Sequence, residues 1–517
     1  MVLLRSIATV GSLTLVSRVF GFARDILIAS SLGAGLLADV FFVAFKFPNL
    51  FRRLFAEGAF NMAFVPIFAG LLEEKGEAAA RRFADQSLAV LLWTLFAFVV
   101  VIEVSMPWVM SAFAPGFREN PEKFALAIEL TRITFPYLLF ISLVSLMAGV
   151  LNSLGRFAAA AATPILLNLC LIGAVLGLSP YVETPAHALA WGVFGAGVVQ
   201  FIWLLVHCRR AGMALRVPFP RLTDDVRLLL ARALPVALGA GIYQINLLID
   251  TVIASLLPEG SISYLFFADR VNQLPLGVVG VAVGTALLPL LSRQIKSDDP
   301  TVAAHSQNRA VEFTLLLTVP AACALVVLAG PIITVLFERG QFGPDQSAAT
   351  AAALGVYALG LPAYVLVKAL APGFFARGDT ATPVKVSVMA LIVNLVLNLL
   401  LMGPFLHVGI AAATVISSWL NAGTMAVILW RRGHLAIDAR LLNRLPRTLI
   451  AAGGMAVALY FGVEFAGGPL AGGEISRALS LAVLVGGGLA TFAALAQITG
   501  AARLGDMKSV LKRGAAT

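Results

Sequence analysis

The sequence predicts an all-α integral membrane protein whose helices cross the bilayer many times. Of its 517 residues, 60% are hydrophobic and only 12% are charged, whereas a soluble domain carries roughly a quarter of charged residues. Apolar stretches of about 20 residues, the length that crosses a bilayer as a helix, recur along the whole chain. Alternating strand patterns are absent from the sequence, and backbone groups in lipid must be satisfied internally. We therefore expect a helical bundle rather than a barrel.

The apolar stretches predict 14 transmembrane helices. Their expected ranges are 7–30, 36–69, 86–112, 125–153, 159–179, 187–207, 228–257, 262–292, 310–337, 346–371, 382–402, 407–430, 446–466 and 476–499.

The basic residues predict the orientation of these helices. When Arg232, Lys385, Arg447 and Arg477 at the helix ends are counted with the adjoining loops, the N-terminus, the C-terminus and the loops after the even-numbered helices hold 25 of the 37 Lys and Arg residues. The other seven loops hold only four. Because basic loops stay in the cytoplasm, we expect both termini on the cytoplasmic side of a bacterial inner membrane. The basic loops 209–232 and 431–447 are then orientation signals, so the net charge of +10 does not indicate nucleic-acid binding.

The chain resembles itself at an offset of about 225 residues. Residues 25–30 (Asp-Ile-Leu-Ile-Ala-Ser) match residues 250–255 (Asp-Thr-Val-Ile-Ala-Ser), and residues 114–117 fall on residues 339–342. Six helices lie within this offset, so the two units keep the same orientation, as in transporters built from parallel repeats. Coincidental similarity between hydrophobic helices is the open alternative.

The repeat predicts a division into three parts. Residues 1–220 form an N-terminal lobe of helices 1–6, and residues 221–440 form a C-terminal lobe of helices 7–12. Residues 441–517 add helices 13 and 14 and a cytoplasmic tail.

Charged residues inside the predicted spans are the candidate functional residues. A charge at the bilayer centre costs roughly 2.5–3.5 kcal/mol on insertion scales, so such residues normally face a cavity and serve function. They concentrate in helices 1, 2 and 8, and helix 1 carries Arg18, Arg24 and Asp25. Arg18 and Asp25 are seven residues apart and share a helical face.

Helix 2 carries a polar stripe with spacings of 7, 3, 4 and 4, which is one continuous helical face. The stripe consists of Asp39, Lys46, Asn49, Arg53 and Glu57, with Arg52 beside it. Pro48 removes a backbone hydrogen bond and is expected to kink this helix.

In helix 8, Ser263, Arg270 and Gln273 repeat at spacings of 7 and 3. Basic residues outnumber acidic ones in the three helices, and Arg suits bidentate recognition of phosphate or carboxylate. The pattern therefore predicts a cavity for an anionic headgroup. The alternative is that Arg–Asp pairs merely hold helices together.

At these residues the sequence resembles the MurJ (MviN) family of lipid II flippases, within the superfamily that includes multidrug and polysaccharide exporters. The likeness covers essentially the whole chain. The segments that carry it are residues 17–25 (Ser-Arg-Val-Phe-Gly-Phe-Ala-Arg-Asp), 38–60, 268–270 (Ala-Asp-Arg), 370–374 (Leu-Ala-Pro-Gly-Phe) and 382–385 (Thr-Pro-Val-Lys).

The resemblance implies two six-helix lobes around a V-shaped cationic cavity, with a groove by helices 13 and 14 for the lipid tail. Arg18, Arg24 and Arg270 would engage the diphosphate or the sugar-peptide headgroup, and Asp25 and Asp39 would organise these arginines and the gate. The expected partners are lipid II and membrane lipids, with cell-wall synthesis proteins as further candidates. Some family members carry Glu where this chain has Gln273, so an acid there is not required in this protein.

Three alternatives stay open from the sequence. Another lipid-linked oligosaccharide flippase or exporter would share this architecture, although a drug antiporter for cations should have an acidic cavity. A membrane enzyme would need clustered carboxylates or histidines, whereas the five histidines are widely separated with no metal-ligand spacing. A scaffold would not need the buried stripe of helix 2. We expect no catalytic residue, metal site or cofactor.

Overall fold

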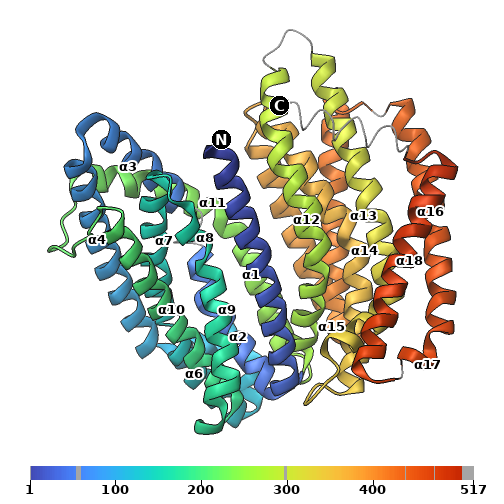
Figure 1. The fold of residues 1–517 in the computed structure, drawn as a ribbon, viewed down its shortest axis with the longest axis horizontal. Coiled ribbons are helices and arrows are strands. Elements are labelled where there is room, and N and C mark those ends of the chain that lie inside the picture. The colour runs from blue at the N-terminus through green and yellow to red at the C-terminus, as the bar shows by residue number, and fades with distance from the viewer. Residues whose placement is uncertain (1, 54–59, 296–299, 437, 471, 503–517) are drawn as a thin grey trace. The chain divides into compact units, whose positions relative to one another are not determined.

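A computed structural model describes residues 2–53, 60–295, 300–436, 438–470 and 472–502. These residues form helices, turns and loops, with no strand among them (Figure 1). Nine helical stretches in the described part of the chain are long and apolar enough to cross a membrane. The prediction of an all-α membrane fold is therefore confirmed, and the total of 14 crossings stays a prediction.

The helices agree with the predicted ranges to within several residues at most ends. The first part of the chain contains α1 (Val2–Leu32), α2 (Leu36–Phe51), α3 (Asn61–Lys75), α4 (Glu77–Val104), α5 (Met106–Phe113), α6 (Pro121–Thr134), α7 (Tyr137–Ser153), α8 (Phe157–Ala161), α9 (Thr163–Gly173), α10 (Pro185–Arg210) and α11 (Asp224–Ser255). The remainder contains α12 (Ser261–Ile295), α13 (Pro300–Phe337), α14 (Pro344–Phe375), α15 (Ala381–Arg431), α16 (Ala439–Phe465), α17 (Gly467–Leu470) and α18 (Glu474–Thr499).

The contacts divide the chain into two compact units. The first contains Met1–Ser263 together with Arg339–Phe342, and the second contains Tyr264–Glu338 and Gly343–Thr517. Helix α11, which the repeat assigns to the C-terminal lobe, thus packs in the first unit with α3 and α4. The three-part division at residues 220 and 440 stays a prediction.

Helix α2 is the central helix of the first unit, and it runs through Pro48 to Phe51. Proline lacks an N–H group, so it leaves the carbonyl four residues earlier without its helical donor. The Thr134 hydroxyl of α6 donates to this carbonyl, that of Ala44, at 2.8 Å. The neighbouring helix thus replaces the lost bond, as in other proline-containing membrane helices.

The regular helix ends instead at Phe51, and Arg52 and Arg53 lie in a wider π-type turn. Within the predicted range 36–69 the structure describes α2 and the first residues of α3, and residues 54–59 between them lie outside the described residues. Glu57 of the predicted polar stripe lies outside the described residues.

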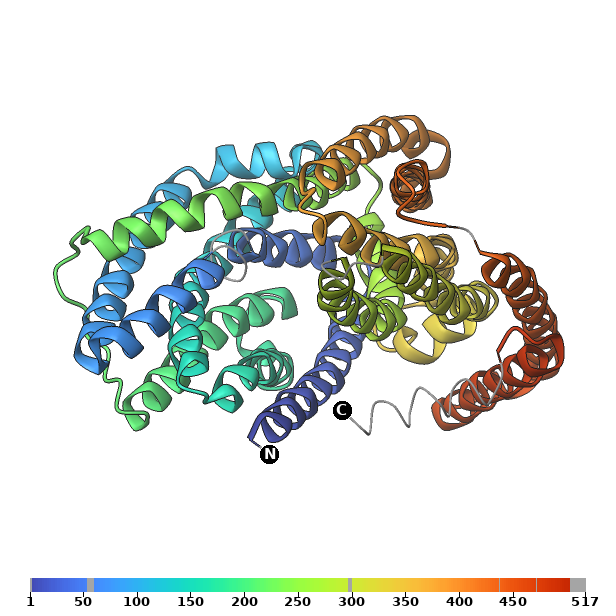
Figure 2. The same cartoon turned by 90° about the horizontal axis from the view of Figure 1, so that it is seen from above.

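The second unit is held by apolar packing of long helices. Helix α13 packs on both α14 and α16, and α16 packs side by side with α18 (Figures 1 and 2). Leu328 of α13 meets Met455, Leu459 and Leu484 in one buried cluster of the last two long helices. Helix α15 is two helices joined at Leu406, whose φ of 50° is not helical. The break falls where the sequence predicts one helix to end at 402 and the next to begin at 407.

Candidate functional site

The first charged group of the first unit is an Arg24–Asp25 pair on α1. The Arg24 guanidinium donates through Nε and Nη2 to Asp25 Oδ1, at 2.9 and 2.6 Å. Its Nη1 donates to the Asn168 side chain of α9 at 2.9 Å, and Asn168 in turn donates to the Ser17 carbonyl at 3.0 Å. Arg24 and Asp25 are only 6% and 3% exposed. The pair therefore fixes α1 against α9 as well as placing charge inside the unit.

Asp39 of α2 organises a second polar group. Its Oδ1 accepts from the Ser263 backbone N–H at 3.0 Å and from the Ser263 hydroxyl at 2.7 Å. Its Oδ2 accepts from the Gly260 N–H at 2.8 Å and from Lys123 Nζ at 3.2 Å. Gly260 and Ser263 lie at the start of α12, where a helix leaves N–H groups unpaired and favours negative charge. Asp39 thus caps α12 from a different helix.

Glu259 makes the corresponding cap in the other direction. Its Oε1 accepts from the Leu36 N–H at 2.6 Å, and Leu36 is the first residue of α2. Gly35, the residue before α2, makes no side-chain cap of its own. The N-terminus of each helix is therefore capped by a carboxylate from the other segment: Glu259 caps α2, and Asp39 caps α12.

Two loops close tightly on the ends of α1 and α11. The Gly116 N–H donates to the Ser255 hydroxyl at 3.3 Å, and a Cβ at Gly116 would lie 2.0 Å from the Ser255 carbonyl oxygen. In the matching arrangement the Gln341 N–H donates to the Ser30 carbonyl at 2.9 Å, and a Cβ at Gly340 would lie 2.3 Å from that oxygen. Only glycine fits either approach.

The remaining sequence-predicted residues of the first unit are Arg18 on α1, Asn49 on α2, Arg52 and Arg53 in the turn after α2, and Ser263 near the start of α12. Asn49 accepts from Arg52 Nε at 2.9 Å, so these two side chains are brought together. Arg18 and Arg53 are exposed. Ser263 lies in the Asp39 group described above.

Arg270 belongs to the second unit. Its guanidinium carbon lies 4.8 Å from the centre of the Phe266 ring, a cation–π contact with the preceding turn of α12. Gln273, one turn further on, donates to Asp269. The predicted role of Arg270 as a headgroup ligand stays a prediction.

Three residues of these groups were not predicted from the sequence: Asn168, Lys123 and Glu259. Lys123 is one of the four basic residues on the side with few positive charges, and it was assigned to a loop. In the structure it is 8% exposed and also lies over the Phe117 ring at 4.4 Å. An isolated Lys in a basic-poor loop, following Asn120 that caps α6, is the signal that could have found it.

The fold and the buried charged groups together indicate the class of protein. An all-helical membrane fold with charged groups buried within a unit is an arrangement found in membrane transporters. A solved structure described as an inward-facing multidrug resistance MATE family transporter of the MOP superfamily matches with a TM-score of 0.68 at 13% identity, covering 82% of this chain and 97% of that one. A structure described as lipid II flippase MurJ in an inward closed conformation matches with a TM-score of 0.79 at 24% identity, covering 95% and 98%.

The family follows from the sequence comparisons. The family model for lipid II flippase MurJ matches residues 28–496. A probable lipid II flippase MurJ of Rhizobium meliloti is 47% identical, covering 100% of this chain and 97% of the relative. A lipid II flippase MurJ of Burkholderia cenocepacia is 38% identical, covering 83% and 84%. The chain belongs to the MurJ family, which confirms the resemblance drawn from its motifs.

Proposed function

We propose that this protein flips lipid II, the undecaprenyl-diphosphate-linked disaccharide peptide, from the cytoplasmic to the periplasmic leaflet of the inner membrane. The observation that carries the proposal is the family match over residues 28–496. The arginines of α1, α2 and α12 suit a diphosphate, because guanidinium groups bind such oxygens in bidentate fashion. Transport needs no covalent chemistry, so the protein acts as a transporter and not as an enzyme.

We further propose 14 transmembrane helices in two parallel six-helix repeats, with two extra helices at the C-terminal end. The paired loop contacts support the repeats. Residues 114–117 and 339–342 correspond at the offset of the repeat, and so do Ser30 and Ser255. Each loop places a glycine against the serine of the other repeat, Gly116 on Ser255 and Gly340 on Ser30. Such an exchange favours the repeats over chance similarity of apolar helices.

The reciprocal caps support an alternating-access mechanism. Under the proposed lobe division, Asp39 belongs to the N-terminal lobe, and Glu259 and Ser263 belong to the C-terminal lobe. In the proposed mechanism these hydrogen bonds join segments of the two lobes at the end that the proposed orientation makes periplasmic. Opening requires the carboxylates and N–H groups of the two caps to replace their mutual hydrogen bonds with hydrogen bonds to water. This replacement is possible at a membrane surface but costly within lipid.

Substrate would be bound by Arg18, Arg24, Arg52, Arg53 and Arg270, with Asp25 and Asn49 holding Arg24 and Arg52 in place. Arg24 is occupied by Asp25 and Asn168 in this structure. A diphosphate would therefore compete with Asp25 for the guanidinium. The polyprenyl tail would stay in lipid beside the predicted helices 13 and 14, which correspond to α16 and α18.

The function is tested with purified protein reconstituted into vesicles that carry labelled lipid II. We expect lipid II to cross at a rate proportional to the protein added, and an undecaprenyl-diphosphate-linked glycan lacking the peptide to cross more slowly. Arg24→Ala should abolish transport, Arg24→Lys should retain part of it, and the exposed Arg227→Ala should not change it. Equal transport by the Arg24 and Arg227 variants would remove Arg24 from the mechanism.

A further inference from the structure

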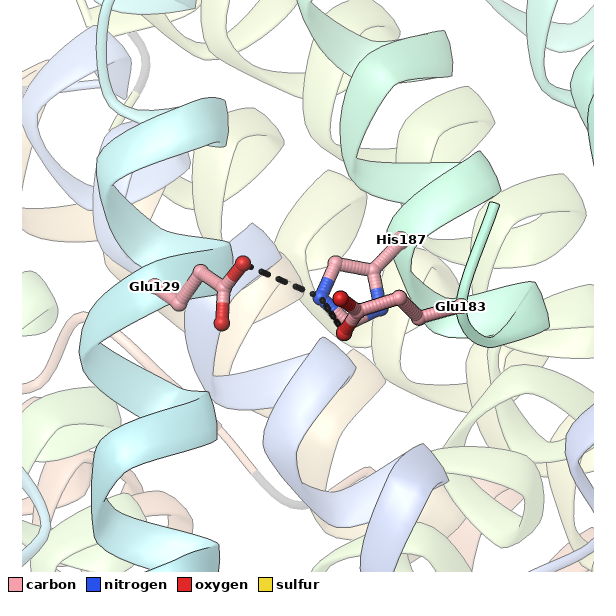
Figure 3. Close-up of side chains that lie close together, drawn as sticks. All are labelled: Glu129, Glu183 and His187. Atoms are coloured by element: carbon pink, nitrogen blue, oxygen red, sulfur yellow. Dashed lines mark ion pairs between the residues drawn. The ribbon is translucent and has the colours of Figure 1, made fainter. Parts of the chain in front are cut away.

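A further polar group of the first unit shares no residue with the groups described above. It consists of Glu129 on α6, Glu183 just before α10, and His187 in the first turn of α10, whose side chains converge in Figure 3. One ligand atom from each residue lies within 4.8 Å of the others. The two glutamates are 54 residues apart in the sequence, so the fold alone brings them together.

His187 is the buried member, with a side chain only 7% exposed. Its Nδ1 lies 2.8 Å from the Thr184 hydroxyl, which fixes the orientation of the ring. Its Nε2 is buried and makes no hydrogen bond within the described part of the chain. This nitrogen points toward the two carboxylates, with Glu129 Oε1 at 3.3 Å and Glu183 Oε2 at 3.9 Å (Figure 3). A buried imidazole nitrogen with no hydrogen bond requires a physical reason.

The distances fit the ligands of one metal ion. Zinc binds imidazole nitrogen and carboxylate oxygen at about 2.0–2.2 Å in tetrahedral geometry, which separates neighbouring ligand atoms by about 3.3–3.5 Å. The His187–Glu129 distance already matches this separation. Glu183 Oε2 lies 3.9 Å from Nε2 and has to come closer to reach this separation, and its side chain is 84% exposed.

The surroundings also suit a metal ion. Glu129 lines an open groove of about 660 Å³ together with Arg132 and Trp191, so an ion can enter from the surface. Thr184 supplies the second hydrogen bond that orients a metal-bound histidine. Arg132, which also lines the groove, follows Glu129 by one turn of α6.

We propose that Glu129, Glu183 and His187 form a binding site for a divalent transition-metal cation such as Zn²⁺, with a fourth position open to water. Two carboxylates and one histidine are a ligand set that zinc accepts, and three protein ligands with an open position are typical of accessible zinc sites. The ion fastens the chain before α10 to α6. In the proposed orientation the site faces the periplasm, where it can take up the ion directly.

The test is a titration of the full-length protein, purified without a histidine tag, with Zn²⁺ and separately with Co²⁺. We expect one saturable site per chain and a visible Co²⁺ absorption typical of four-coordination. Glu129→Gln, Glu183→Gln and His187→Gln should each weaken binding at least about tenfold. Glu122→Gln on α6 and His207→Gln on α10 are the matched controls, and they should leave the affinity unchanged.

Glu183→Gln keeps the test valid if His187→Gln fails to fold, because Glu183 is exposed and packs against little. The proposal is overturned if the native protein has no saturable site, since the imidazole is then held by a proton shared with the carboxylates. It is equally overturned if all three variants bind as tightly as the native protein. Transport by the native chain does not enter either readout, so failure here leaves the flippase function intact.

Discussion

Asp39 and Glu259 cap each other's helices: Asp39 of α2 accepts from N–H groups at the start of α12, and Glu259 before α12 accepts from the first N–H of α2. Asp39 is 1% exposed. A buried carboxylate needs compensation for its lost hydration, and here three hydrogen bonds and one ammonium group provide it. The start of α2 and the start of α12 are therefore joined by one network of hydrogen bonds and charges.

Removing the Asp39 carboxylate should weaken the contact between the start of α2 and the start of α12. We expect Asp39→Asn to lower the free energy of unfolding by about 3–5 kcal/mol, because it leaves the buried Lys123 unpaired. Lys123→Met in the same chain should restore part of the loss, so the two changes should be non-additive in thermal unfolding. Asp345→Asn, an exposed acid at the start of α14, is the control. Strict additivity would mean that the Lys123 contact contributes nothing.

The close approach of Gly116 gives a purely steric prediction. A methyl group at Gly116 would lie 2.0 Å from the Ser255 carbonyl oxygen, so the loop must move away. We expect Gly116→Ala to destabilise the fold by about 1–3 kcal/mol, the usual cost of overpacking, and to slow lipid II transport. Gly177→Ala, which meets nothing within 4 Å, should behave like the native protein in both measurements. Native behaviour of the Gly116 variant would show that this contact does not form.

The loop between α14 and α15 gives a prediction about pH. Hydrogen bonds from Thr382 and Arg432 hold the pKa of Asp379 well below its usual range. A carboxyl with a lowered folded-state pKa stabilises the protein above its unfolded pKa of about 3.9 and loses this effect as the pH falls below that value. Asp379→Asn should therefore lower the melting temperature at pH 7, and the difference should shrink toward pH 3. A difference that is equal at both pH values would contradict this assignment.

The orientation is tested by labelling with an impermeant thiol reagent in a chain whose native cysteines have been replaced. Cys at Tyr181 and at Phe405, which are 83% and 58% exposed, should react from the periplasm. Cys at Val217 and at Phe219, which are 53% and 80% exposed, should react only after the membrane is opened. The reverse pattern would overturn the orientation derived from the basic loops.

Hydropathy predicted the positions of the helices well, because the length and polarity of a membrane helix are set by the bilayer itself. It even placed the break of α15 near Leu406. It did not predict that the helical segment of α2 continues past Pro48 to Phe51, since the replacement donor, Thr134, comes from another helix. The turn at Arg52 was likewise missed.

The sequence predicted which charged residues are candidates for the site, but it did not predict which residues they contact. The stripe of α2 and the arginines of α1 stand out because charge is rare in such a chain. Asn168, Lys123 and Glu259 do not stand out, because each lies in a polar or mixed segment and gains its role only when distant helices meet. The same holds for His187, whose two carboxylate neighbours are set by the packing of α6 and α10.

The central claim is that this protein carries lipid II across the membrane, and one measurement in cells tests it most directly. The native flippase of a bacterial host is depleted, this chain is expressed in its place, and lipid II in the periplasmic leaflet is measured with a probe that cannot enter the cell. We predict that lipid II disappears from the outer leaflet on depletion, returns with this chain, and does not return with its Arg24→Ala variant present at the same level in the membrane. If the outer-leaflet lipid II does not return with the native chain, although the chain is inserted and folded, the account is wrong.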